Sequence, residues 1–199
     1  MRKPTAGATD LALFSALIDA NVLYAVPVAD IVMEVACSGL YRALWSDDIN
    51  DEWVRNVMRD RPDLPASVIE RRRANMELAL PQARVVGYEH LVAGLALPDP
   101  TDHHVLAAAI VGRADVIVTY NLADFPAAML EPFGIEAQHP DEFLNHQRTL
   151  DEPMFLQCIK NIRGRLKSPP YTPDAYIANL RKNQLQVIPS ELDKVKGLI

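Results

Sequence analysis

The sequence contains few cysteines, and their arrangement excludes two kinds of site. Among its 199 residues only Cys37 and Cys158 are cysteines, and they form no CxxC motif and have no histidine beside them. A disulfide framework or a zinc site requires more cysteines at closer spacing. We therefore expect both residues to be reduced, buried thiols.

The sequence also lacks a long apolar run. No stretch approaches the roughly 20 apolar residues of a membrane span, and residues 1–9 contain basic side chains but no apolar segment before a cleavage site. Internal repeats and low-complexity tracts are absent too. We therefore expect a cytoplasmic protein without a membrane partner, folded as one domain with a small appendage.

Positive charge is scarce overall but unevenly distributed. The net charge is −6, which argues against a protein that coats nucleic acid non-specifically. Residues 1–150 carry −9, whereas residues 151–199 carry +3. The acidic part could hold a metal ion, and Arg163, Arg165 and Lys167 in the basic tail could contact an anionic partner. The alternative is that these tail residues pack the appendage or hold a protein partner.

Short apolar runs alternate with longer amphipathic segments up to about residue 139, which predicts an α/β fold with a parallel sheet. Later segments contain no strand-like run and predict a helical appendage. Predicted strands cover 13–19, 84–88, 115–119 and 134–138. Predicted helices cover 27–39, 47–60, 66–80, 89–96, 100–113, a short segment after Pro126, and then 140–149, 152–166 and 173–182.

Two acidic residues follow apolar runs that end at one edge of the predicted sheet. Asp19 follows Ala16-Leu17-Ile18, and Asp124 lies in the loop after Val116-Ile117-Val118. Ligands of open α/β sheets bind at the carboxyl ends of the strands, and carboxylates gathered there suit a hard divalent cation. The alternatives are local: Asp19 could form an Asx turn, and Asp124 could cap the helix after Pro126.

Two further acidic residues lie on predicted helices. Glu52 flanks the apolar stripe of helix 47–60, for which Ser46 is the predicted N-cap, and it could equally be a solvated glutamate. Asp102 lies in the first turn of a helix capped by Asp99, where a capping-box role is the alternative. Three consecutive alanines, 107–109, would let this helix lie close to the sheet.

The adjacent histidines of this helix are poor candidates for metal ligands. His103 and His104 diverge by about 100° on a helix, so they cannot both face one ion. A site built from carboxylates alone favours Mg²⁺ or Mn²⁺ over zinc.

Three segments that contain these acidic residues resemble, in sequence and in order along the chain, the motifs of the PIN domain. This nuclease family includes the VapC toxins of bacterial toxin–antitoxin pairs. The motifs are Leu17-Ile18-Asp19-Ala20-Asn21-Val22-Leu23, Asp99-Pro100-Thr101-Asp102-His103-His104-Val105-Leu106-Ala107-Ala108-Ala109 and Val116-Ile117-Val118-Thr119-Tyr120-Asn121-Leu122-Ala123-Asp124-Phe125. The tail resembles a helical extension found on some of these toxins.

The resemblance implies a three-layer α/β/α PIN-like fold with a central parallel sheet of four or five strands in residues 1–140, and a C-terminal helical extension in residues 141–199. It implies Mg²⁺-dependent endoribonuclease activity, with Asp19, Asp102 and Asp124 as metal ligands and Glu52 as the second family acid. At that second position Asp48 and Asp51 compete with Glu52. Thr119 and Asn121 would support the site, and at position 121 many relatives have Asp.

The resemblance also implies an RNA substrate and a cognate antitoxin, and it leaves a homodimer open. Proposed contacts to RNA phosphates are Arg55, Arg59, Arg71, Arg72 and Arg73, together with Arg163, Arg165 and Lys167 of the tail. The run 71–73 could instead form a solvated helix face. Three other functions are alternatives: an RNA-processing nuclease, a PIN-like module that only binds a partner, and a phosphatase with Asp19 as nucleophile. The phosphatase would require a second Asp at position 21, where this chain has Asn.

Overall fold

The computed structural model describes residues 14–199, and at its centre is a four-stranded, all-parallel sheet with the strand order β2-β1-β3-β4. The α/β class and the parallel sheet predicted from the sequence are confirmed. Residue 13, the first of the predicted strand 13–19, lies outside the described residues. The strands are β1 (Ser15–Ile18), β2 (Arg42–Leu44), β3 (Val116–Val118) and β4 (Glu136–Gln138).

The second strand was predicted in the wrong place. Segment 84–88 forms only an isolated bridge, between Arg84 and Trp45, whereas β2 pairs with β1 along its length. The pair of valines at 85 and 86 favours a strand, but Gly87 turns the chain at a φ of +79°. The three-residue β2 directly follows a helix, so its apolar residues do not stand out as a separate run.

Most helices lie where the periodicity predicts them. The α-helices are α1 (Ala20–Tyr24), α2 (Val26–Cys37), α3 (Asp47–Asp60), α4 (Ala66–Ala79), α5 (Glu89–Val92), α6 (His103–Gly112), α7 (Ala127–Leu130), α8 (Pro140–Leu150), α9 (Glu152–Arg165), α10 (Pro173–Lys182) and α11 (Val187–Lys194). Short 3₁₀ turns are η1 (Pro100–Asp102), η2 (Leu122–Asp124), η3 (Glu131–Phe133) and η4 (Lys196–Leu198).

Helix ends follow the capping chemistry of the sequence. Ser46 accepts a hydrogen bond from the Ile49 amide and starts α3 at the predicted residue. The predicted helix 89–96 is too long, because α5 ends at Val92, two residues before Gly94. Helices α1 and α11 were not predicted.

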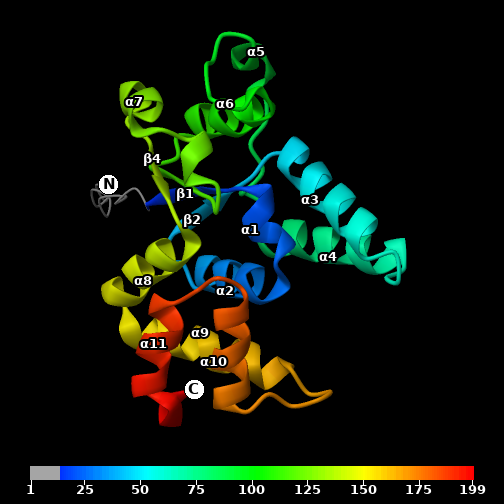
Figure 1. Ribbon diagram of the computed structural model, residues 1–199, viewed down its shortest axis with the longest axis vertical. Helices are drawn as coiled ribbons and strands as arrows, with labels where there is room; N and C mark the ends of the chain where they lie inside the picture. The colour runs from blue at the N-terminus through cyan, green and yellow to red at the C-terminus, as the bar shows by residue number, and fades with distance from the viewer. Residues whose placement is uncertain (1–13) are drawn as a thin grey trace, which may run out of the picture.

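Helices cover both faces of the sheet (Figure 1). Helices α5, α6 and α7 lie on one side, and α2 with the C-terminal helices lies on the other. Ala107, Ala108 and Ala109 are fully buried, and α6 contacts β1 and β3 as the small side chains predict. Gly112 ends this helix close to its neighbours, since a Cβ atom there would lie 2.9 Å from Val85 Cγ2.

The C-terminal helices pack on α2 rather than standing apart (Figure 1). Glu34 of α2 pairs with Arg165 at 2.7 Å and accepts a hydrogen bond from Asn161 at 3.0 Å. Asp141 of α8 is buried and accepts hydrogen bonds from three backbone amides at the start of α11, those of Gln186, Val187 and Ile188, at 2.6, 2.7 and 2.9 Å. The helical appendage is thus anchored both to the sheet-bearing part and internally.

The cysteine prediction is half right. Both thiols are free, but Cys37 is exposed while Cys158 is buried against the Glu34 carbonyl. Cys37 is the last residue of α2, and a turn follows it at Ser38. Within residues 14–199, no helix combines the length and apolar character that a membrane crossing requires.

Candidate functional site

Asp19 lies where the sequence places it, directly after β1 and beside the end of β3. Its backbone amide donates to the Val118 carbonyl at 3.0 Å, and its side chain caps α1 by accepting from the Ala20 amide at 2.6 Å. Asp19 therefore has a local role as the N-cap of α1, although this bond to the next residue is not the Asx turn raised as the alternative. This cap leaves the second carboxylate oxygen of Asp19 free for other contacts.

That second oxygen is held by Asn21 and Thr119. Asn21 Nδ2 donates to Asp19 Oδ2 at 2.6 Å and to Thr119 Oγ1 at 2.9 Å, and the Thr119 hydroxyl donates to Asp19 Oδ2 at 2.7 Å. Asn21 Oδ1 in turn accepts from the Tyr120 amide at 3.1 Å. Sequence reasoning missed this role of Asn21, although the Asp-x-Asn spacing at the start of a helix was a usable signal.

Asp102 and Asp124 have no local structural role that would explain them. Asp102 occupies the N-cap position of α6 but makes no side-chain capping hydrogen bond. The N-cap of α7 is Pro126, so Asp124 does not cap that helix. Within residues 14–199, neither carboxylate has a hydrogen-bond or ion-pair partner, in contrast to Asp99, which caps η1. Both local alternatives raised by the sequence are absent.

The acidic residues of α3 divide into two groups. Four of them are engaged elsewhere: Asp47 pairs with Arg84, Asp48 accepts from Tyr88 Oη at 2.8 Å, Asp51 pairs with Arg73 at 2.5 Å, and Asp60 pairs with Arg59. Glu52 has none of these contacts. Its nearest ionisable partner is His104, whose Nε2 lies 3.6 Å from Glu52 Oε2.

The position of His104 was not anticipated. The prediction that the two histidines diverge is consistent with the structure, because His103 Nε2 instead accepts from the Leu97 amide at 3.1 Å. Two adjacent helical histidines cannot both bind one metal ion, but one of them can still lie close to the acidic residues. The Nδ1 atom of His104 is buried and has no partner within the described residues.

Burial raises the pKa of Asp19 to about 6. The Thr119 hydrogen bond opposes this shift, whereas the charge of Glu52 adds to it and that of His104 reduces it. Asp19 is only 4% exposed, so its charged form is poorly solvated. Hydrogen bonds thus fix the orientation of the Asp19 carboxylate, but no Lys or Arg within residues 14–199 neutralises its charge.

Asp102 is affected more strongly by the other acidic residues. Its pKa is raised to about 7, first by desolvation and then by the charges of Asp19, Asp99, Asp124 and Glu52. The charges of the other three predicted acids thus reach Asp102, although the four come from separate elements. Like charges gathered in this way favour the protonated form unless a cation is present.

The donor set fits a hard divalent cation, although it is not arranged as a closed coordination shell. Within residues 14–199, no three His, Cys, Asp or Glu side chains lie close enough to hold one ion together, and no Lys or Arg pairs with the four acids. Carboxylates whose charge no cation balances repel one another. An ion bound through oxygen and water would supply the missing positive charge.

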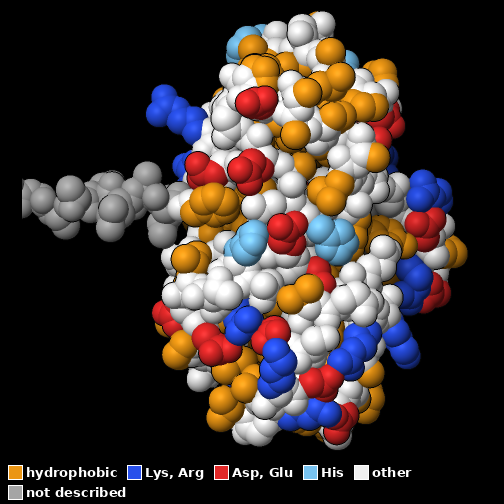
Figure 2. All heavy atoms as spheres, turned by 60° about the vertical axis from the view of Figure 1, so that its left-hand side comes forward, with side chains coloured by type: hydrophobic (Ala, Val, Ile, Leu, Met, Phe, Trp, Pro, Cys, Tyr) orange, Lys and Arg blue, Asp and Glu red, His pale blue; other side chains and the backbone are white. Residues whose placement is uncertain are grey.

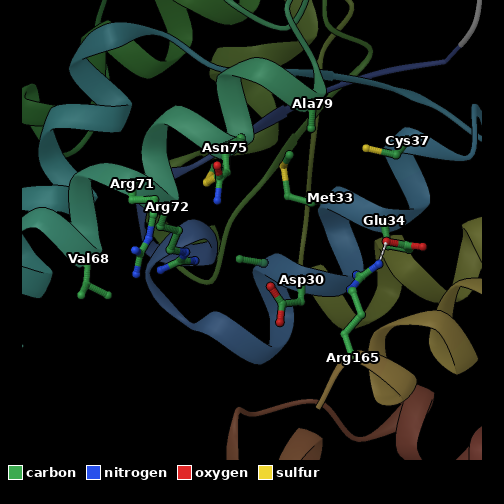
Figure 3. A pocket seen from close by; sticks show the side chains of 12 residues that line it. Asp30, Met33, Glu34, Cys37, Val68, Arg71, Arg72, Asn75, Ala79 and Arg165 are labelled. Atoms are coloured by element: carbon green, nitrogen blue, oxygen red, sulfur yellow. Dashed lines mark ion pairs between the residues drawn. The ribbon is translucent and has the colours of Figure 1, made fainter. Parts of the chain in front are cut away.

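The arginines proposed to contact RNA occupy different environments. Arg71 and Arg72 line a pocket of about 500 Å³ between α2 and α4, in which Asp30 also lies (Figure 3). Arg72 donates to the Leu23 carbonyl and lies 4.8 Å from the centroid of the Trp53 ring, while Arg73 pairs with acidic side chains. Arg55 and Arg59 are exposed, and Arg59 pairs with Asp60 at 2.8 Å.

The basic residues of the tail are partly engaged inside the protein. Arg163 donates to the backbone carbonyls of Tyr171 and Ile199, and Arg165 pairs with Glu34; Lys167 is exposed. Figure 2 shows Lys and Arg side chains interspersed with Asp and Glu over the lower part of the molecule, where the C-terminal helices lie. This face is not a continuous basic surface, and the proposed RNA contacts remain a prediction.

Replacing Asp102 by Asn is expected to stabilise the metal-free protein. The folded-state pKa of Asp102 is about 7 rather than 3.8. Its charge therefore does not lower the free energy of unfolding near pH 4, and the loss of stability grows with pH until it is complete above pH 7. After allowance for solvent screening we expect a gain of about 1–2 kcal/mol, or roughly 2–6 °C in Tm, at pH 8 in EDTA. Thermal unfolding measured from pH 4 to pH 8 checks this.

Asp63→Asn is the matched control for this experiment. Hydrogen bonds from Arg61 lower the pKa of Asp63, so its replacement should not raise Tm at pH 8. Equal Tm values for wild type and Asp102→Asn at pH 8 would contradict the electrostatic account of the site.

Two family models match the chain. The model of the PIN domain matches residues 15–123, and that of the VapC50 C-terminal domain matches residues 140–192. A Mycobacterium tuberculosis protein named "Putative ribonuclease VapC50" is 41% identical over 98 residues, which are 49% of this chain and 57% of that relative. The chain thus spans just over half of the relative's length, and no solved structure gives a significant match. The two family models together cover most of the described residues, and the parallel sheet agrees with the first of them. This chain therefore belongs to the PIN domain family and carries a C-terminal extension of the VapC50 type.

Proposed function

We propose that this protein is an Mg²⁺- or Mn²⁺-dependent endoribonuclease of the cytoplasm and the toxin of a toxin–antitoxin pair. The observation that carries the proposal is that Asp19, Glu52 and Asp124, from separate elements, lie near enough to Asp102 for their charges to act on it, while none of the four acids pairs with Lys or Arg within residues 14–199. Membership of the PIN domain family and the relative named as a ribonuclease support the choice of reaction.

In this proposal Asp19, Asp102 and Asp124 hold the metal ion directly or through water, and Glu52 orients the attacking water. A bound divalent ion would polarise the scissile phosphate and favour formation of hydroxide near neutral pH. Asn21 and Thr119 hold the Asp19 carboxylate in one orientation through the hydrogen bonds described above. Water adds to phosphorus while a P–O bond to ribose breaks, so the products are a phosphate monoester and a hydroxyl group.

A panel of single-stranded RNAs incubated with the full chain tests the reaction. We expect cleavage in Mg²⁺ or Mn²⁺ and none in excess EDTA, with activity restored when the metal is added back. Full activity in EDTA would contradict the proposal. A phosphatase acting through Asp19 has less support, because the position of its second Asp is Asn21, which is engaged with Asp19.

The toxin role is tested in cells. Expression of the wild type should arrest growth, and co-expression of a small protein encoded by an adjacent gene should relieve the arrest through a stable complex. A harmless wild type with proven nuclease activity would favour the RNA-processing alternative. A partner complex without any nuclease activity would favour the binding module.

A further inference from the structure

The segment after β3, residues 119–124 and here called the β3 loop, carries Thr119 and Asp124 of the proposed site. Two groups of contacts hold it from the sheet side. The Thr119 amide donates to the Gln138 carbonyl at 3.0 Å, and the Thr119 hydroxyl accepts from the Asn121 amide at 3.0 Å. The Tyr120 amide donates to Asn21, which itself contacts Asp19. The backbone of Tyr120 is therefore linked to the acids through a single side chain.

The side chain of Tyr120 is directed toward the C-terminal extension. Its hydroxyl donates to the backbone carbonyl of Asn183 at 2.9 Å, just after α10 ends. Its ring lies edge-on to His139 with centroids 5.0 Å apart. Tyr120 therefore joins the β3 loop to the segment between α10 and α11.

Hydrogen bonds and burial hold the segment between α10 and α11 in place within the extension. Asp141 accepts hydrogen bonds from three consecutive amides, 186–188, and Leu185 is fully buried. Asn183 Nδ2 also donates to the Asn179 carbonyl at 2.8 Å. The acceptor that Tyr120 meets is thus held independently of Tyr120 itself.

We propose that Tyr120 is a positioning residue through which the C-terminal extension holds the β3 loop, and with it Asp124, in the geometry that RNA cleavage requires. The proposal rests on the proposed function for its catalytic part only. It gives the extension a role that the sequence left undefined, since no acid of the site lies in residues 141–199. The chemistry required is one neutral hydrogen bond between a loop and a rigid acceptor, which limits loop motion without contacting substrate.

Tyr120→Phe tests the proposal because it removes the hydroxyl and keeps the ring on His139. We expect kcat for RNA cleavage to fall about 3- to 10-fold with KM unchanged, as loss of one hydrogen bond that acts on the reacting geometry predicts. Hydrogen–deuterium exchange at the amides of Tyr120, Asn121 and Asp124 should become faster by a similar factor. Tm should stay within about 2 °C of the wild type.

Tyr24→Phe is the matched control, since Tyr24 donates to the exposed Asp60 at 3.2 Å, outside the β3 loop. It should change neither kcat nor exchange in the β3 loop. Unchanged exchange in Tyr120→Phe, or faster exchange with unchanged kcat, would overturn the proposal. If the wild type cleaves no RNA, faster exchange in the β3 loop still supports the link to the extension, and only the proposed function fails.

Discussion

Asp19→Asn is expected to reduce metal-dependent RNA cleavage by about 10²- to 10³-fold or more, because it removes a ligand charge at the most buried of the four acids. The fold should survive. With a folded-state pKa of about 6, the charge of Asp19 costs up to about 3 kcal/mol above pH 7, and its loss offsets the roughly 1–2 kcal/mol of a mismatched hydrogen bond to Thr119 or Asn21.

Initial rates on a single-stranded RNA with Mn²⁺, together with thermal unfolding in EDTA, check both parts of this prediction. Asp63→Asn is the matched control, because Asp63 is exposed and its ion-pair partner within residues 14–199 is Arg61, and it should leave the rate unchanged. Cleavage by Asp19→Asn at the wild-type rate would exclude the proposed mechanism. Loss of folded protein would show instead that the capping role of Asp19 dominates.

Asp141→Ala should cause a large loss of stability, about 3–5 kcal/mol, which corresponds to a fall in Tm of roughly 10 °C. The substitution leaves three backbone amides at the start of α11 without their shared acceptor, in a setting where Asp141 is only 5% exposed. It also removes a negative charge from a helix N-terminus, where such a charge is favourable. Urea unfolding followed by circular dichroism measures the loss.

Asp174→Ala provides the comparison within the same extension. Asp174 is largely exposed, and its partner Lys196 also pairs with Asp193, so its removal should change stability by less than about 0.5 kcal/mol. Asp141→Asn should lie between wild type and Asp141→Ala, because the amide keeps one acceptor oxygen. Equal stabilities for all these variants would mean that α11 does not depend on this cap.

The sequence could predict the fold class and the position of Asp19 and Asp124 beyond two strand ends, because both depend on local patterns. Amphipathic periodicity and the cap at Ser46 place α3 correctly, and the alternation of strands and helices predicts a parallel sheet. Asp19 and Asp124 follow strands that become neighbours in that sheet. Parallel pairing alone therefore brings them to one edge, without knowledge of any side-chain contact.

Other features depend on contacts between distant residues and could not be predicted. The three residues of β2 are recognisable only by their pairing with β1. Glu52 differs from Asp48 and Asp51 because Tyr88 and Arg73, which lie far along the chain, engage the latter two. The same holds for His104, whose approach to Glu52 requires α6 and α3 to be placed side by side.

The absence of any structural partner for Asp102 and Asp124 within residues 14–199 also bears on how this gene would change under selection. A single-base change converts an Asp codon to Asn, and at either position it would abolish a proposed ligand while leaving every described hydrogen bond of the fold in place. If activity harms the cell, one such substitution should therefore be enough to give a full-length, folded, inactive protein. If the proposed antitoxin binds this chain, the inactive protein should still bind it and compete with active copies for it.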